Sequence, residues 1–518
     1  MASAELTGIE ANGSQERARF RELQAGFAEA WPHLAANPKA PRTVVVLPSL
    51  SLDTGVLARI AGAHHYEERM LCMLLLLRLP RTQLVFVSSQ PVAESTIEYY
   101  LGLLPGVPHA HARARLHMIC CHDATEHPLA EKLLGRPRLV ERIRELIRDP
   151  ASAHLSCFTV SPAERTLAVR LGVPIYGCDP DLADLGSKSG SRKIFREAGI
   201  GMPAGVEDIT DEQALAEALA ELRSRDPDLR RAVVKLNEGF SGEGNAVFSF
   251  AGAPSGSGLR RWVAGRLPRL GFEAQGMEWE TYRAKLGQMG AIAEAFIEGR
   301  EKRSPSAQYR VEPDGTLDMV STHDQVLGGP SGQIFLGGGF PADPAYRLEI
   351  QAAGREAALR LREHGVLGRF GIDFISVQRG RHWEHHAIEV NLRKGGTTHP
   401  NLMLQFMTGG TYEPATGTFA TPTGQLCCYH ASDNVQAEAY RGLTPDDLVD
   451  LAVLEDLQFD PARQEGVVFH LIGALSEFGK LGMVAVGATP ERAGELFRAT
   501  IAVLDRETGN ASDPAGTP

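Results

Sequence analysis

The chain has 518 residues, of which 43% are apolar and 23% are charged, and its formal net charge is −11 at pH 7. A chain of this length has room for roughly two to four domains, and the composition is that of an ordinary soluble globular protein. The negative balance gives no general reason to bind nucleic acid, although a local basic pocket could still hold a phosphorylated ligand.

The cysteines and the apolar segments indicate a cytoplasmic protein. There are seven cysteines, two pairs of them adjacent, with no C-x-x-C and no tetrahedral zinc spacing, so we expect reduced thiols packed as small apolar residues. The N-terminal residues lack the basic and apolar regions of a secretory signal. The run MLCMLLLLRL (70–79) is about half a bilayer span, which favours a buried helix over a membrane segment. A homo-oligomer is left open.

The first part of the chain predicts one or two leading helices over 1–40 and then an α/β domain over 41–185. In that domain apolar strands such as TVVVLPSL, QLVFVSS and HLSCFTVS alternate with helical stretches. Strands that alternate with helices in this way predict βαβ units and a parallel sheet.

The middle of the chain, 186–407, follows a different pattern. SKSGSRKIFREAGI predicts a helix, VVKLNEGFSGEGNAVF predicts two strands around a glycine-rich turn, and AIAEAFIEG predicts a strand. The segment LGRFGIDFISVQRGRHWEHHAIEVN predicts a hairpin with its turn near Arg379–Gly380. Sequential strands that pair with each other indicate an α+β arrangement.

A Thr/Gly/Pro-rich loop (408–424) leads to a small α+β domain over 425–506. Its last helix is expected to begin with Thr489 as N-cap and Pro490 at the first helical position. The end of the chain, 507–518, is expected to be disordered.

Polar residues alternate along the second strand of the predicted hairpin, in EVNLRKGGTTHP. Side chains on a strand alternate faces, so Glu389, Asn391 and Arg393 point the same way, with Asp373 roughly opposite Glu389. Two carboxylates so close would raise each other's pKa unless a cation lay between them, and oxygen ligands suit Mg²⁺ or Mn²⁺. The alternative is a solvated hairpin, which the apolar opposite face of FGIDFISV and AIEV disfavours.

A lysine and a glycine-rich turn are candidates for binding phosphates. Lys235 ends an apolar strand, and the turn after it contains Gly239, Ser241, Gly242 and Gly244. Glycines let backbone N–H groups approach phosphate oxygens, and the lysine adds a positive charge. The alternative is a plain flexible turn, since the segment is neither a Walker A sequence nor a Rossmann fingerprint.

Taken in chain order, the helix before AGIGMP, the Lys235 turn, EAFI, Asp373 and EVN resemble the ATP-grasp superfamily. The resemblance implies that Lys188 and Lys235 meet the nucleotide phosphates. It also implies that Glu294 takes the adenine amino group and the Ile297 backbone the ring edge. Ser187 stands where many members have Asp, so Lys193 on the same helix is a rival to Lys188.

The same resemblance implies that Glu301 binds the ribose and that Asp373, Glu389 and Asn391 are the metal ligands. Arg393 matches the arginine that steadies the acyl phosphate. ATP and Mg²⁺ or Mn²⁺ are therefore the expected cofactors.

A closer resemblance covers most of the chain. GRFGIDFISV, EVNLRKGGTTHP and GVVFHLIGALSEFGKLG are similar to the pheganomycin-type peptide ligases. That family implies a Rossmann-like pre-ATP-grasp domain, an ATP-grasp module and a family-specific C-terminal domain. It also implies an ADP-forming reaction that joins an amino-acid carboxylate to the amine of a peptide through an acyl phosphate. The alternatives are an ATP-binding regulatory module without activity, or an ATP-grasp kinase or carboxylase.

Several other motifs have two readings. STHDQVLGGPSGQIFLGGGF (321–340) is expected to form either a loop that closes over the substrate or simple turns. RHWEHH resembles a metal cluster but lies in the predicted hairpin turn, which favours a solvated loop. His64 and His65 lack ligand-spaced partners and are expected at the surface or in caps. His399, after GGTT, could reach the substrate.

Overall fold

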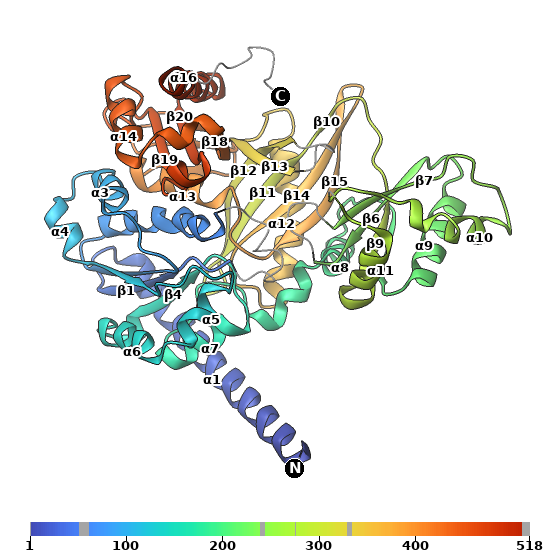
Figure 1. Cartoon of the computed structure of the whole chain (residues 1–518), viewed down its shortest axis with the longest axis horizontal. Coiled ribbons are helices and arrows are strands. Elements are labelled where there is room, and N and C mark those ends of the chain that lie inside the picture. The colour runs from blue at the N-terminus through green and yellow to red at the C-terminus, as the bar shows by residue number, and fades with distance from the viewer. Residues whose placement is uncertain (1, 51–61, 239–243, 275, 329–333, 510–518) are drawn as a thin grey trace.

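The computed structural model describes residues 2–50, 62–238, 244–274, 276–328 and 334–509. Helix α1 (Ala2–Ala36) comes first and projects from the body of the molecule at its N-terminal end (Figure 1). Its second half is anchored by buried Phe20, Phe27 and Leu34.

The α/β prediction for the first domain is confirmed, because four parallel strands pair in the order β3-β2-β1-β4. The strands are mostly apolar and largely buried, as expected for a parallel sheet covered on both faces. They are β1 (Arg42–Leu47), β2 (Thr82–Ser88), β3 (Leu116–Cys120) and β4 (Ala153–Cys157). The surrounding helices are η1 (Ala63–Arg78), α3 (Glu94–Gly102), α4 (His109–Arg113), α5 (Leu129–Leu134), α6 (Pro137–Leu146) and α7 (Pro162–Leu171).

The apolar run at 70–79 is buried, as predicted, within η1, a 3₁₀ helix. None of the helices among the described residues combines the length and the apolar character that a bilayer span needs.

A five-stranded antiparallel sheet follows, in the order β5-β9-β6-β7-β8. Its strands are β5 (Gly205–Ile209), β6 (Arg231–Leu236), β7 (Asn245–Ser249), β8 (Gly271–Phe272) and β9 (Ala291–Ala295). Helices α9 (Glu212–Arg225), α10 (Leu259–Ala264) and α11 (Trp279–Met289) contribute to the same core. The predicted pair of strands around the glycine-rich turn is confirmed as β6 and β7.

The central sheet has nine strands in the order β10-β14-β11-β12-β13-β18-β20-β19, with β15 paired to β14. The strands are β10 (Lys302–Arg303), β11 (Pro305–Val311), β12 (Leu317–Gly328), β13 (Ile334–Phe340), β14 (Gly368–Arg379), β15 (His382–Asn391), β18 (Cys428–Gln436), β19 (Gly466–His470) and β20 (Lys480–Gly487). Helix α12 (Arg347–Glu363) packs on one face of this sheet, and α8 (Lys188–Ala198) packs on α12 and β15.

The hairpin at the edge of this sheet matches its prediction, because Arg379 pairs with His382 across the turn. Two neighbouring predictions are wrong. The segment 321–340 forms β12 and β13, apart from 329–333, which lie outside the described residues. RHWEHH is not a loop either, because a two-residue turn leaves His382–His386 within β15.

The C-terminal strands continue the central sheet, since β18 pairs with β13 from Gly337↔Ser432 to Phe340↔Tyr429. Between the two lie α13 (Thr398–Thr408) and a small hairpin, β16 (Thr411–Glu413) and β17 (Thr418–Ala420). The C-terminal helices are η5 (Glu438–Gly442), α14 (Pro445–Leu454), α15 (Ala474–Phe478) and α16 (Pro490–Thr508).

The predicted start of the last helix is confirmed, because the Thr489 side chain accepts a hydrogen bond from Arg492 N. The predicted start of the disordered tail, at residue 507, is too early, since α16 extends to Thr508. Residues 510–518 lie outside the described part of the chain.

Candidate functional site

A cavity of about 1010 Å³ lies where the five-stranded sheet, the central sheet and the first domain meet. This volume suits a nucleotide together with a second ligand, since pockets for single small molecules are about 300–1,000 Å³. Residues of β6, β7 and β9 line one part of it, residues of β14 and β15 a second part, and residues of η1 and β18 a third. The predicted residues that line it are Lys188, Lys235, Gly244, Glu294, Ile297, Asp373, Glu389, Asn391 and Arg393.

The middle of the cavity contains the proposed metal ligands. Asp373 pairs directly with Glu389 across β14 and β15, as expected from the alternation, and Gly371 pairs with Asn391. Asn391 Nδ2 donates to Asp373 Oδ2 at 3.0 Å, which brings the amide and the carboxylate together. Two carboxylates and an amide oxygen on one cavity wall form an oxygen donor set that fits Mg²⁺ or Mn²⁺.

The two carboxylates have opposite electrostatic environments. Burial raises the pKa of Asp373, and the nearby charge of Glu389 raises it further. Burial would also raise the pKa of Glu389, but Lys188, whose Nζ lies 2.5 Å from Glu389 Oε1, lowers it together with Arg393 and Lys235, and the net shift is downward. A cation beside Asp373 would favour its charged form in the same way, so this residue fits a metal ligand.

The position of α8 separates the two rival lysines. The Ser187 side chain caps this helix by accepting from Gly190 N at 2.9 Å, and Lys188 follows with its side chain in the cavity wall. Lys193 lies outside the cavity lining, with its side chain 47% exposed and paired with Asp208 at 2.9 Å. Between the two, the geometry therefore favours Lys188 for the phosphates.

Lys235 is held by a buried acid. It is the penultimate residue of β6, its side chain pairs with Glu294 on β9, and the two residues are 7% and 3% exposed. The second oxygen of Glu294 accepts from Arg192 Nη1 at 3.1 Å. Both carboxylate oxygens are thus engaged by cations, so Glu294 positions Lys235; its predicted contact with the adenine amino group stays a prediction.

The remaining predicted nucleotide contacts have mixed outcomes. Gly244 and Ile297 line the cavity, and the Gly244 carbonyl accepts from Leu236 N. Ser241 and Gly242 lie outside the described residues. Glu301 is not part of the lining; its carboxylate instead pairs with Arg303 at 3.1 Å. The predicted ribose contact of Glu301 has no support from this geometry.

Arg393 lines the cavity next to Asn391, one of the proposed metal ligands. Its Nη2 donates to Asn391 Oδ1 at 3.3 Å and its Nη1 to the Lys394 carbonyl at 3.3 Å. No carboxylate pairs with it among the described residues. A guanidinium that lines a cavity without an acidic partner is suited to bind an anionic group of a ligand.

The expected substrate loop contributes to the site from a strand. Asp324 and Gln325 on β12 line the cavity, and Gln325 hydrogen-bonds Asp373. Both carboxylate oxygens of Asp324 already accept hydrogen bonds within the protein, from Tyr346 Oη and Asp343 N. His323 is fully buried and lies 2.6 Å from Tyr429 Oη.

His399 is buried rather than directed at the cavity. Its Nε2 and that of His470 lie 2.9 and 2.8 Å from Asp433 Oδ1. These are metal-ligand side chains, but both Nδ1 atoms lack a partner within the described part of the chain, whereas metal-bound histidines normally hydrogen-bond through the second nitrogen. We therefore interpret the cluster as two histidines that donate to Asp433 and fix it.

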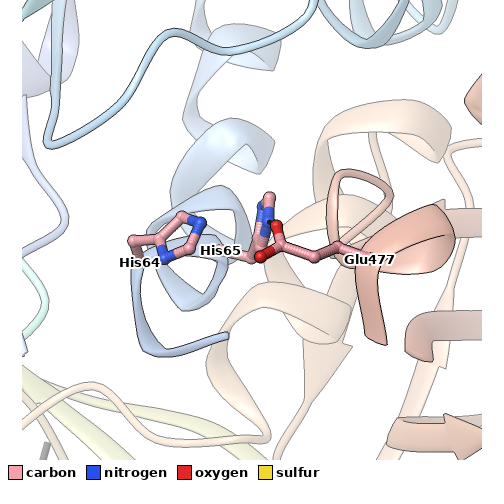
Figure 2. Close-up of side chains that lie close together, drawn as sticks. All are labelled: His64, His65 and Glu477. Carbon is pink, nitrogen blue, oxygen red and sulfur yellow. Dashed lines mark hydrogen bonds and ion pairs between the residues drawn. The ribbon is translucent and has the colours of Figure 1, made fainter. Parts of the chain in front are cut away.

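His64 and His65 are partly buried, and the expectation that they lack carboxylate partners is wrong for His65, which contacts Glu68 on the same helix and Glu477 from the C-terminal part of the chain. Glu477 on α15 lies beside His65, with His64 on the other side (Figure 2). His65 Nδ1 is 2.9 Å from Glu68 Oε1, and its Nε2 is 3.5 Å from Glu477 Oε2. The contact between His65 and Glu477 joins η1 to the C-terminal part of the chain.

Sequence reasoning missed the cavity end lined by Tyr66, Arg69, Phe158, Asp433 and Asn434. The residues come from three separate segments, and none forms a local motif. One signal was available: Asp433 lies in β18 between residues of a buried strand, where a carboxylate is unusual unless polar partners are provided.

Comparison with known proteins identifies two parts of the chain and a relative of nearly its whole length. Residues 180–253 match the family model described as IQCH-like, ATP-grasp, and residues 447–500 match the PGM1 C-terminal domain. The chain is 31% identical over 472 residues to the L-propargylglycine–L-glutamate ligase of Streptantibioticus cattleyicolor, covering 89% of this chain and 94% of that protein.

Two solved structures share the fold. The biotin carboxylase of Campylobacter jejuni has a TM-score of 0.53 at 12% identity, with 91% of this chain and 96% of that chain covered. The biotin carboxylase domain of Hydrogenobacter thermophilus 2-oxoglutarate carboxylase, solved with MgADP and bicarbonate, also has a TM-score of 0.53 at 12% identity, with 89% of each chain covered.

Proposed function

This chain belongs to the ATP-grasp superfamily, in the pheganomycin-type peptide ligase family, and we propose that it joins an amino-acid carboxylate to the amine of a second amino acid or peptide. It is an ATP-dependent ligase that forms carbon–nitrogen bonds. The proposal concerns its substrates, its metal and the role of each residue. We place the reaction in natural-product peptide biosynthesis in the cytoplasm, in keeping with its seven free cysteines.

The observation that carries the proposal is the wall formed by Asp373, Glu389 and Asn391, with Lys188 beside it. Asp373, Glu389 and Asn391 would hold Mg²⁺ or Mn²⁺, which neutralises phosphate charge and orients the nucleotide. Lys188, beside Glu389, and Lys235, at the end of the cavity lined by β6 and β9, would bind the phosphates.

The other residues act on the acyl group. Arg393 is placed to bind the carboxylate that becomes the acyl phosphate, and then to stabilise the oxyanion that develops when the amine attacks. Exclusion of water during the reaction would protect the acyl phosphate from hydrolysis. No protein nucleophile is required by this route, and ADP and phosphate are the expected co-products.

The test is ADP release from ATP and Mg²⁺ with pairs of amino acids, followed by mass spectrometry of the product. We expect an amide dipeptide with wild-type protein and loss of turnover in N391A. The matched control is E384A, which removes an exposed acid of the same strand. ADP release without an amide product, or full amide formation by N391A, would contradict the proposal.

A further inference from the structure

The end of the cavity that is lined by η1 and β18, away from β6, β7 and β9, is positively charged. Arg69 lines it, and Lys480 supports it by donating to Tyr66 Oη at 2.7 Å and Asn434 Oδ1 at 2.9 Å. Asp433 is the acid of this end, and its Oδ1 already accepts hydrogen bonds from two histidines. An anionic ligand group would therefore complement this surface.

Arg69 is held in one orientation. Its guanidinium carbon lies 4.7 Å from the centre of the Tyr66 ring and 4.2 Å from that of Phe158. Its Nε donates to the Tyr66 carbonyl at 3.2 Å, and its Nη1 lies 3.4 Å from Asp433 Oδ2. The Nη2 group has no hydrogen-bond partner among the described residues.

The electrostatics of Arg69 favour a further anion. The residue is 5% exposed, and burial lowers the pKa of its guanidinium against the opposing effect of Asp433. The second arginine, Arg393, is close enough to add to this destabilisation. A carboxylate placed against the free edge of Arg69 would gain charge-assisted hydrogen bonds in a water-poor site.

We propose that Arg69 binds the unreacted carboxylate of the amine substrate, so that the acceptor is an amino acid or peptide with a free carboxylate. The inference rests on the proposed ligase function. Arg393 lies beside the metal residues, where the activated carboxylate would lie, and Arg69 lies beyond it on the side of η1 and β18. A ligand whose amine attacks near Arg393 would extend its carboxylate toward Arg69.

The experiment compares each acceptor with its primary amide, using ADP release and product mass spectrometry. Wild-type protein is expected to prefer the free acid, and R69Q should lower the acid-to-amide ratio of kcat/KM by about 10- to 100-fold. The ratio of kcat/KM between the donor amino acid and its side-chain analogues should stay unchanged in R69Q. R260Q removes an exposed arginine of α10 and should keep the wild-type ratio.

The variants separate binding from folding. R69M, which keeps apolar contact with the two rings, replaces R69Q if that variant does not show ATP-dependent thermal stabilisation. A wild-type ratio in the folded variant, or a changed ratio for the donor instead of the acceptor, would overturn the inference alone. Absence of ADP release from wild-type protein with every pair would overturn the proposed function and the inference with it.

Discussion

Asp373 and Glu389 share one face of a hairpin, yet their proton affinities move in opposite directions. Burial and Glu389 raise the pKa of Asp373, whereas Lys188 lowers that of Glu389 against the effect of burial. Among the described residues, Asp373 thus has no cation as close as Lys188 is to Glu389 to offset the effect of burial on its pKa. In this state it contributes stability at low pH that is lost as the pH rises through its raised pKa.

A prediction follows for binding of Mg²⁺. Protons compete with the cation at Asp373, whose pKa is raised, so Mg²⁺ affinity should rise with pH above the ordinary aspartate value of 3.8. Titration calorimetry with MgCl₂ in the presence of ADP, between about pH 5 and 7, measures this slope. D373N should weaken binding and flatten the slope, and an equally steep slope in D373N would contradict the assignment.

At the scale of an element, the rotation of α8 about its axis decides which of its two lysines faces the cavity. Lys188 pairs with Glu389 in the cavity wall, while Lys193 pairs with Asp208 in solvent. K188A should lower kcat/KM for ATP by about 10- to 100-fold, since it removes a charge-assisted contact and leaves Glu389 unpaired. K193A is the control on the same helix.

Steady-state kinetics with varied ATP tests the pair of variants. We expect K193A to stay within about twofold of wild type, because exposed ion pairs contribute little. Equal losses in both variants would mean that α8 presents a different face to the nucleotide.

Elements with a complete local signal were predictable from the sequence. Strand alternation and a short turn were enough to pair Asp373 with Glu389, and Thr489 with Pro490 marked the start of α16. The choice between Lys188 and Lys193 was not, because a helix sequence does not tell which of its faces meets a sheet. The segment 321–340 was misjudged because its glycines suggested turns. Gly337, Gly338 and Gly339 instead lie in β13, where they allow close approach of the neighbouring strand: a side chain at Gly337 would meet the Ala431 carbonyl at 2.2 Å.

At the scale of the whole molecule, the missed residues are those joined over the longest distances in sequence. Arg69 and Asp433 are 364 residues apart, and His65 and Glu477 are 412 apart. No periodicity or spacing within one sequence predicts such a meeting. The cavity residues on β6, β9, β14 and β15 were predictable from local motifs, whereas the end lined by Arg69 and Asp433 required the tertiary structure.

The C-terminal part of the chain should be inseparable from the rest. A chain ended after Gly424 would lack β18, β19 and β20 and expose the edge of β13. Unpaired strand edges promote aggregation, so we expect this truncation to be recovered as aggregates in size-exclusion chromatography. A chain ended after Gly509 is the control and should elute as the full-length protein. A monodisperse 1–424 fragment that binds ATP would contradict this.

The unbroken run of strands from β15 to β19 also bears on how such enzymes diversify. Because β18 is both a strand of the central sheet and, through Asp433 and Asn434, part of the cavity lining, exchanging the C-terminal portion would disturb the sheet together with the cavity. Substrate preference in this lineage would instead change one side chain at a time, around Arg69 and Asn434, upon an unaltered backbone.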